Sequence, residues 1–189
     1  ASALSAALEA KGFKVHLTRE PGGTPGAEII RELLLSGHDE KWNMRTEALL
    51  FAAARSEHCA TLIKPALDRG EWIISDRFID SSRAYQSVGG QLGNEDIMAL
   101  HQVGSQNLMP HRTFILDLPE EIAARRAEAR DRGDSDRIGG RDSDYHRAVM
   151  TKFRQYAHEE PDRVKLIDAA LLPEEVTANL LQNLTDLIG

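Results

Sequence analysis

The sequence predicts an α/β protein with a parallel sheet covered by helices on both faces. Short strand-like segments alternate with segments of helical periodicity along the whole chain. Several of the strand-like segments, such as Trp72-Ile73-Ile74, are uninterrupted apolar runs, typical of strands buried on both sides. Polar and glycine residues follow directly where these runs end, which is where ligands bind in such sheets.

The first half of the chain contains two of the predicted strands. Residues 2–11 carry leucines at helical spacing, and residues 13–18 alternate apolar and polar side chains as a strand does. Helices are predicted over 26–35, 46–68 and 80–86, the long one bent or restarted near Pro65. Residues 71–76 form the second strand.

The second half repeats the alternation. Asn94 is predicted to cap a helix that runs to about residue 106. A strand over 113–118 leads into a helix that starts at Pro119. A helix over 142–159, a strand over 164–168 and a helix over 173–187 complete the chain. Since no internal repeat or linker occurs, the 189 residues are expected to form a single domain.

Charge and cysteine content exclude several classes of protein. The net charge of −7 argues against broad binding to nucleic acid or to anionic membranes. No apolar run approaches the roughly 20 residues that cross a bilayer. The one cysteine, Cys59, fits a reducing compartment, so we expect a cytoplasmic protein. Neither Cys59 nor the seven histidines show metal-ligand or nucleophile spacing.

Glu20-Pro21-Gly22-Gly23 follows the first predicted strand. Proline fixes the chain direction, and the glycines permit positive φ and close approach of a ligand. This pattern fits a ligand-binding turn, with Glu20 and Arg19 available to substrate or to each other. It also fits a tight connection with no further role.

Phe51 and Arg55 are four residues apart on one helix face, so together they can stack on a flat base and bond its edge. A core phenylalanine beside a solvated arginine is the alternative. Ser82, Tyr85 and Gln86 carry groups that can read a base or sugar, although ordinary helix surface, or core for Tyr85, explains them too.

Asp76-Arg77 ends the second predicted strand. Arginine binds phosphate with a fork of donors, and aspartate can place Mg²⁺ or its water shell. The alternative is a structural ion pair. Farther along, arginines interleave with acids and glycines between Arg125 and Arg147. That segment is either a solvated mixed-charge face or a mobile lid, at about 130–142, that closes over polyphosphate.

These features together suit transfer of a phosphoryl group between two phosphorylated molecules. No Gly-x-x-x-x-Gly-Lys-Ser/Thr phosphate loop occurs in the chain, although such an enzyme is expected to need one.

The motifs resemble those of thymidylate kinases. The run from Thr18 to Leu35, the segment Leu50–Arg55, the segment Ser75–Gln86 and Asp136-Arg137-Ile138 occur in that family's order. The resemblance spans essentially the whole chain and implies a P-loop nucleoside-monophosphate kinase fold. It also implies phosphorylation of dTMP to dTDP, with ATP as co-substrate and Mg²⁺ as cofactor, for dTTP synthesis. A binding-only fragment that holds dTMP without turnover, or a related nucleoside-monophosphate kinase, is the alternative.

The resemblance assigns roles residue by residue. Phe51 would stack on thymine and Arg55 would bond its edge, with Ser82 and Gln86 near the base and Tyr85 under the sugar. Glu20 would lie beside the sugar and phosphate, Pro21 would also belong to the substrate-binding residues, Arg31 and Arg77 would bind the dTMP phosphate, and Asp76 would help place Mg²⁺. The lid arginines facing ATP would be Arg126, Arg130, Arg132 and Arg137. Phe78 stands where the family often has tyrosine.

The family begins with a strand, a phosphate loop and a helix, and this chain starts inside that helix. We therefore expect the natural protein to carry roughly 15–20 further residues at its start. The family is usually homodimeric, and the helix from Thr46 or the one from Asn94 would supply the interface.

Overall fold

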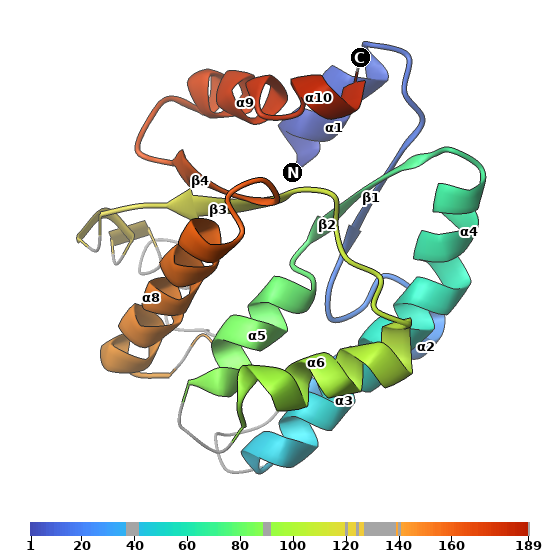
Figure 1. Ribbon diagram of the computed structural model, residues 1–189, viewed down its shortest axis with the longest axis vertical. Coiled ribbons are helices and arrows are strands. Elements are labelled where there is room, and N and C mark those ends of the chain that lie inside the picture. Colours follow the sequence, from blue (N-terminus) through green and yellow to red (C-terminus); the bar gives the residue numbers. More distant parts are fainter. Residues whose placement is uncertain are drawn as a thin grey trace.

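The computed structural model describes residues 1–36, 42–88, 92–119, 121–123, 125–126, 139 and 141–188. Strands and helices alternate along it, as Figure 1 shows. The strands are β1 (Val15–Arg19), β2 (Trp72–Asp76), β3 (Thr113–Asp117) and β4 (Val164–Asp168). Each lies within two residues of its prediction, which confirms the alternating α/β order.

The strands pair in parallel, but as two separate pairs. β1 lies beside β2, with Val15 opposite Trp72, and β3 lies beside β4, with Thr113 opposite Val164. In the described part of the chain no backbone hydrogen bond joins β2 to β3, so the four strands make two two-stranded sheets. The prediction of parallel strands is therefore confirmed, while one continuous sheet is not observed among these residues.

One face of both sheets packs against helices from the two ends of the chain. These are α1 (Ser2–Glu9), α9 (Pro173–Gln182) and α10 (Thr185–Ile188), which lie together in Figure 1. Leu8 of α1, Ile167 of β4 and Leu180 of α9 are buried in one apolar cluster. Val15, Trp72 and Phe114 pack against it, so this cluster joins the two sheets.

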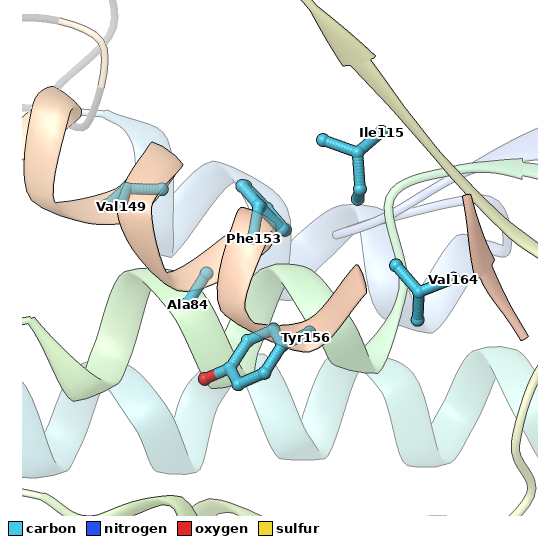
Figure 2. Close-up of a cluster of buried hydrophobic side chains, with 6 residues drawn as sticks. All are labelled: Ala84, Ile115, Val149, Phe153, Tyr156 and Val164. Carbon is cyan, nitrogen blue, oxygen red and sulfur yellow. The ribbon is translucent and has the colours of Figure 1, made fainter. Parts of the chain in front are cut away.

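The opposite face of β3 and β4 packs against α5 (Ile79–Ser87) and α8 (Ser143–Glu159). Figure 2 shows the cluster between these elements, with Ala84 on α5, Val149, Phe153 and Tyr156 on α8, and Ile115 and Val164 from the strands. Its six buried members are Ala84, Ile115, Val149, Phe153, Tyr156 and Val164. Tyr85 packs against this cluster, so α5 is fixed beside it.

The remaining helices are α2 (Pro25–Leu35), α3 (Met44–His58), α4 (Lys64–Asp68) and α6 (Asn94–Ser105). Thr24 caps α2 by accepting from the Ala27 N–H, and Asn43 caps α3 by accepting from the Thr46 N–H. The single long helix predicted over 46–68 consists of α3, a π-helical segment η1 (Cys59–Ile63) and α4, which begins beside Pro65. The predicted restart near Pro65 is confirmed.

Two local predictions are wrong. Asn94 is the first residue of α6 rather than its cap, because Gly93 holds the cap position and its N–H is bonded by Asp96. Asn94 instead accepts a hydrogen bond from Arg83. The residues Trp72-Ile73-Ile74 are half-buried rather than buried, because β2 has a strand partner on one side only in the described chain. Among the described residues no helix is long and apolar enough to span a membrane.

Candidate functional site

The carboxyl ends of β1 and β2 bring two predicted motifs side by side. Arg19 lies opposite Asp76 in the sheet register, and the Glu20 N–H donates to the Asp76 carbonyl at 3.0 Å. The Glu20–Gly23 turn and the Asp76–Arg77 turn therefore leave the sheet as neighbours. This is the edge at which parallel sheets place their ligands.

The turn after β1 requires its glycines. Gly22 and Gly23 have φ values of +125° and +88°, and the Glu20–Pro21 peptide is cis. A β-carbon on Gly23 would lie 2.4 Å from the Thr18 hydroxyl and 2.7 Å from His58 Nε2. Only glycine fits there, which explains the sequence pattern in structural terms.

The polar groups of this turn are held by α2. Glu28 accepts from the Gly23 N–H at 2.8 Å and pairs with Arg19 at 3.0 Å. The Gly23 hydrogen bond, followed by Arg19, holds the pKa of Glu28 below its ordinary value. Arg31 donates to the Pro21 carbonyl at 2.6 Å, so its guanidinium lies against the turn. Arg19 thus pairs with Glu28 rather than with Glu20.

Glu20 binds Arg55 from the middle of α3. Arg55 Nε donates to Glu20 Oε2 at 2.8 Å, and Arg55 Nη2 donates to the Ser82 hydroxyl at 2.6 Å. All three side chains are buried. Three residues predicted to bind substrate, from β1, α3 and α5, therefore form one hydrogen-bonded group.

His58, which was not predicted as a site residue, completes this group. Its Nδ1 lies 3.0 Å from Glu20 Oε1, and its Nε2 lies 2.8 Å from the Thr18 hydroxyl. The His58 side chain is fully buried. It is one helical turn from Arg55, and that spacing is the only sequence feature that could have pointed to it.

Phe51 lies between two polar contacts that join α3 to α5. Arg55 meets Ser82 one helical turn after Phe51, and Glu47 meets Gln86 one turn before it, with Gln86 Nε2 3.3 Å from Glu47 Oε1. Phe51 itself is half-buried. The predicted stacking residue is thus flanked on its own helix face by groups that can hydrogen-bond a base.

Glu47 also binds Arg141, which begins the last described part of the chain. Arg141 Nη2 lies 2.7 Å from Glu47 Oε2, and Arg141 Nη1 contacts the Tyr145 hydroxyl. The Tyr145 hydroxyl in turn donates to the Tyr85 carbonyl at 2.7 Å. Burial raises the pKa of Tyr145 to about 12, with Arg141 opposing, so this phenol stays protonated. Neither Glu47 nor Arg141 was predicted as a site residue.

Arg77 adopts an uncommon backbone conformation at the end of β2. Its φ is +75°, in the left-handed region, and Ser75 holds its carbonyl with a 2.8 Å hydrogen bond. The guanidinium lies over the ring of Tyr85, 4.9 Å from the centroid. Asp76 is exposed, and its carboxylate has no side-chain partner among the residues the structure describes.

A buried ion cluster anchors α5, which carries Ser82, Tyr85 and Gln86. Arg163 binds both oxygens of Asp80, at 2.7 and 2.8 Å, and Arg83 and Thr113 bind the same carboxylate. Burial raises the pKa of Asp80, but these donors outweigh it and the pKa lies below its ordinary value. The start of α5 is thereby fixed to the starts of β3 and β4.

The carboxyl ends of β3 and β4 carry a second polar group. Arg154 of α8 binds Asp117 at 2.8 Å, and Arg126 donates to the Ala169 carbonyl at 3.1 Å. Of the predicted lid arginines, only Arg126 is described. Arg130, Arg132, Arg137 and most of the predicted lid at 130–142 lie outside the described residues.

The structure does not bring all predicted residues into one contact group. Glu20, Arg55 and Ser82 are joined directly, Arg31 touches Pro21, and Arg77 stacks on Tyr85. An open cavity of about 570 Å³ lies over the turn after β1, lined by Leu17, Thr18, Arg19, Gly23, Thr24, Pro25 and Glu28. That lining does not include Phe51 or Arg55, so the cavity lies apart from the two side chains predicted to bind a base.

Two features of the described residues bear on metal and thiol chemistry. Within the described ranges no group of three or more histidine, cysteine, aspartate or glutamate residues is arranged to hold a metal ion. Cys59 is buried, and burial raises the pKa of its thiol to about 11, so it is an inert packing residue.

The chain is similar to known proteins over almost all its length. The family model described as thymidylate kinase matches residues 1–180. A thymidylate kinase of Rhizorhabdus wittichii is 50% identical over 188 residues, covering 100% of this chain and 90% of that protein. Those of Pseudomonas syringae pv. tomato and Caulobacter vibrioides are 46% and 42% identical, covering 98% and 96% of this chain and 87% and 86% of theirs. On both comparisons, the chain belongs to the thymidylate kinase family and has its α/β nucleoside-monophosphate kinase fold.

Proposed function

We propose that this protein transfers the γ-phosphoryl group of ATP to the phosphate of dTMP, giving dTDP and ADP, as one step of dTTP synthesis. The P–O bond to the leaving ADP breaks, and a dTMP phosphate oxygen forms the new bond to phosphorus. The observation that carries the proposal is the buried Glu20–Arg55–Ser82 group beside Phe51. Arg55 lies one helical turn after Phe51 on the same face of α3, a spacing that suits recognition of a flat base.

Base recognition is assigned to α3 and α5. Phe51 stacks on thymine, and Arg55 donates to a base carbonyl from Nη1, which has no partner among the described residues. Gln86 and Ser82 lie at the polar edge of the thymine base, and Tyr85 lies under the sugar of dTMP. Because Glu20 neutralises the buried guanidinium, Arg55 can offer a hydrogen bond to a neutral base without an isolated buried charge.

Phosphate recognition is assigned to Arg31 and Arg77, with Glu20 and Pro21 beside the sugar. Arg77 is held over Tyr85, and its side chain is exposed at the end of β2, where an anion can reach it. The acceptor oxygen is already an anion, so no strong general base is needed. Catalysis then rests on positioning and on charge neutralisation by arginines.

Asp76 fits the role of a magnesium-placing residue. Its carboxylate is exposed at the strand end and has no side-chain partner in the described chain, and Mg²⁺ prefers oxygen ligands and water. Mg²⁺ supplies charge neutralisation on the phosphates of ATP. Arg126, Arg130, Arg132 and Arg137 are proposed to face ATP from the lid.

We also propose that the chain forms a single domain and that the protein is a cytoplasmic homodimer. The helices α2, α3 and α6 form its interface. Four large apolar side chains on these helices are exposed, at 41–86% of their surface: Ile29, Leu33, Leu49 and Val103. Exposed apolar side chains on neighbouring helices suit an interface between copies.

The experiment that tests the function is ATP-dependent phosphorylation of dTMP by the purified protein, with dUMP, UMP and dCMP as competing acceptors. Preferred turnover of dTMP is expected. Preference for another nucleotide would indicate a related kinase, and binding of dTMP without turnover would indicate a binding-only protein. Either result would overturn the proposal.

A further inference from the structure

Gln86 has one amide atom bonded and the other left without a partner. Its Nε2 faces Glu47 Oε1 at 3.3 Å, while Oε1 is buried with no hydrogen-bond partner among the described residues. Gln86 as a whole is 1% exposed. Burying a carbonyl oxygen without a hydrogen bond costs desolvation free energy. The oxygen is therefore available to accept a hydrogen bond from a bound ligand.

Glu47 determines which amide atom is left over. An ionised carboxylate only accepts hydrogen bonds, so the Gln86 atom that faces it must be the NH₂ group. Arg141 lies 2.7 Å from the other Glu47 oxygen and neutralises the buried charge. The two contacts together hold the carboxylate, and the carboxylate holds Gln86 with its oxygen turned away from Glu47.

We propose that Glu47 is a positioning residue that makes Gln86 present an acceptor to the base and thereby selects thymine over cytosine. This inference rests on the proposed function. The ring nitrogen N3 of thymine carries a hydrogen and donates, whereas N3 of cytosine is bare and accepts. An oxygen on Gln86 therefore favours thymine, and an NH₂ in its place would favour cytosine.

The substitution Glu47→Gln reverses this arrangement. Arg141 requires an acceptor, so the oxygen of the new amide turns to Arg141 and its NH₂ turns to Gln86. Gln86 then turns its own oxygen to residue 47 and presents NH₂ to the base. The change preserves side-chain volume, so packing around α3 and α5 is retained.

The test measures equilibrium binding of dTMP, dUMP and dCMP by calorimetry, together with steady-state kinetics, for the unmodified protein and its variants. Glu47→Gln is expected to weaken dTMP and dUMP binding about tenfold or more, while dCMP binding is unchanged or tighter. Turnover at saturating dTMP is expected to stay within about threefold. Gln86→Leu should weaken dTMP binding to a similar extent, and combining it with Glu47→Gln should add nothing, because Glu47 acts through Gln86.

Arg141→Gln is the matched control. It removes the ion pair with Glu47 but leaves a carboxylate facing Gln86, so the preference for dTMP over dCMP should persist even if the protein becomes less stable. If Glu47→Gln does not fold, the double variant Glu47→Gln, Arg141→Met removes both buried charges together. There both orientations of Gln86 become possible, and the preference for dTMP should fall.

The inference is overturned if Glu47→Gln keeps the dTMP-to-dCMP binding ratio of the unmodified protein, or if its effect adds to that of Gln86→Leu. Failure of the proposed function looks different, because the unmodified protein itself would then neither bind nor phosphorylate dTMP.

Discussion

Arg55 and Glu20 are joined by a 2.8 Å hydrogen bond, and each side chain is only 4% exposed. The pair links the end of β1 to the middle of α3, and Ser82 extends it to α5. The desolvation free energy of two buried charges is about as large as their Coulomb attraction, so a buried ion pair adds little net stability. We therefore attribute the role of this pair to the side chains that it holds in position. Here it fixes the arginine that we assign to the base.

Replacing Glu20 with glutamine should therefore affect both stability and binding. The change leaves Arg55 buried without a counter-charge, so we expect the free energy of unfolding to fall by about 3 kcal/mol. Binding of dTMP should weaken as well, because Arg55 loses its orientation. Urea unfolding and calorimetric titration measure the two effects. Arg147→Gln, which alters an exposed ion pair, should change stability by about 0.5 kcal/mol or less.

Arg77 allows backbone and side-chain effects to be separated. Arg77→Gly removes the guanidinium but suits the left-handed φ of +75°, so the melting temperature should not fall. Arg77→Ala removes the same group and keeps the backbone strain. Both variants should lose turnover by about a hundredfold or more. Unchanged kinetics in either variant would exclude Arg77 from phosphate binding.

Phe51→Ala should raise the Michaelis constant for dTMP while changing turnover at saturation much less, because it removes stacking and no charge. Loss of about 1–3 kcal/mol of base stacking corresponds to a rise of about fivefold to 140-fold. Phe51→Tyr keeps the ring and should behave nearly as the unmodified protein does. Equal Michaelis constants for the alanine and tyrosine variants would contradict the stacking role.

The Asp80 cluster predicts acid sensitivity. The pKa of Asp80 is depressed in the folded state, so its contribution to stability is fully present above the ordinary aspartate pKa near 3.8 and is lost as pH falls through the folded value. Unfolding measured between pH 7 and pH 3 should show a decline that begins below about pH 4. Asp80→Asn should be less stable at neutral pH and should lose this part of the decline. Parallel curves for the two proteins would show that Asp80 does not contribute.

Val103 tests the proposed dimer. It is 86% exposed on α6, so Val103→Glu should fold normally if the chain is monomeric and should prevent association if α6 lies in the interface. Light scattering after size-exclusion chromatography would report the mass of each protein. Ala178→Glu, at an exposed position on α9, serves as the control and should leave the mass unchanged.

Local pattern was sufficient to predict much of this fold. The strands are marked by short apolar runs or by alternating apolar and polar residues, and Val164–Asp168 was predicted without error because turn residues bound it on both sides. The position of Asn94 was wrong because asparagine and glycine can both precede a helix, and only the contact with Arg83 decides between them. The half-burial of β2 depends on which strands lie beside it. The neighbours of a strand cannot be predicted from the pattern of its own residues.

The site could be predicted only in part, for a related reason. Glycines after a strand and an aromatic residue four before an arginine are local signals, and they pointed to Gly23, Phe51 and Arg55. Glu47 meets Arg141 across 94 positions of sequence, and Glu20 meets His58 across 38. Such pairings depend on tertiary packing. The partner of a charged residue on a helix therefore cannot be predicted from the helical pattern around it.

The pairing of the strands has a consequence for how the chain folds. Each sheet joins segments that are distant in sequence: Lys14 and Glu71 are 57 residues apart beside β1 and β2, and Arg112 and Asp162 are 50 apart beside β3 and β4. Closing loops of this length carries an entropic cost before any strand contact forms, whereas helices such as α3 and α8 depend on near neighbours. We therefore expect helix formation to precede sheet formation during refolding. The Glu20–Arg55–Ser82 group, which needs β1, α3 and α5 together, should then be among the last features to assemble.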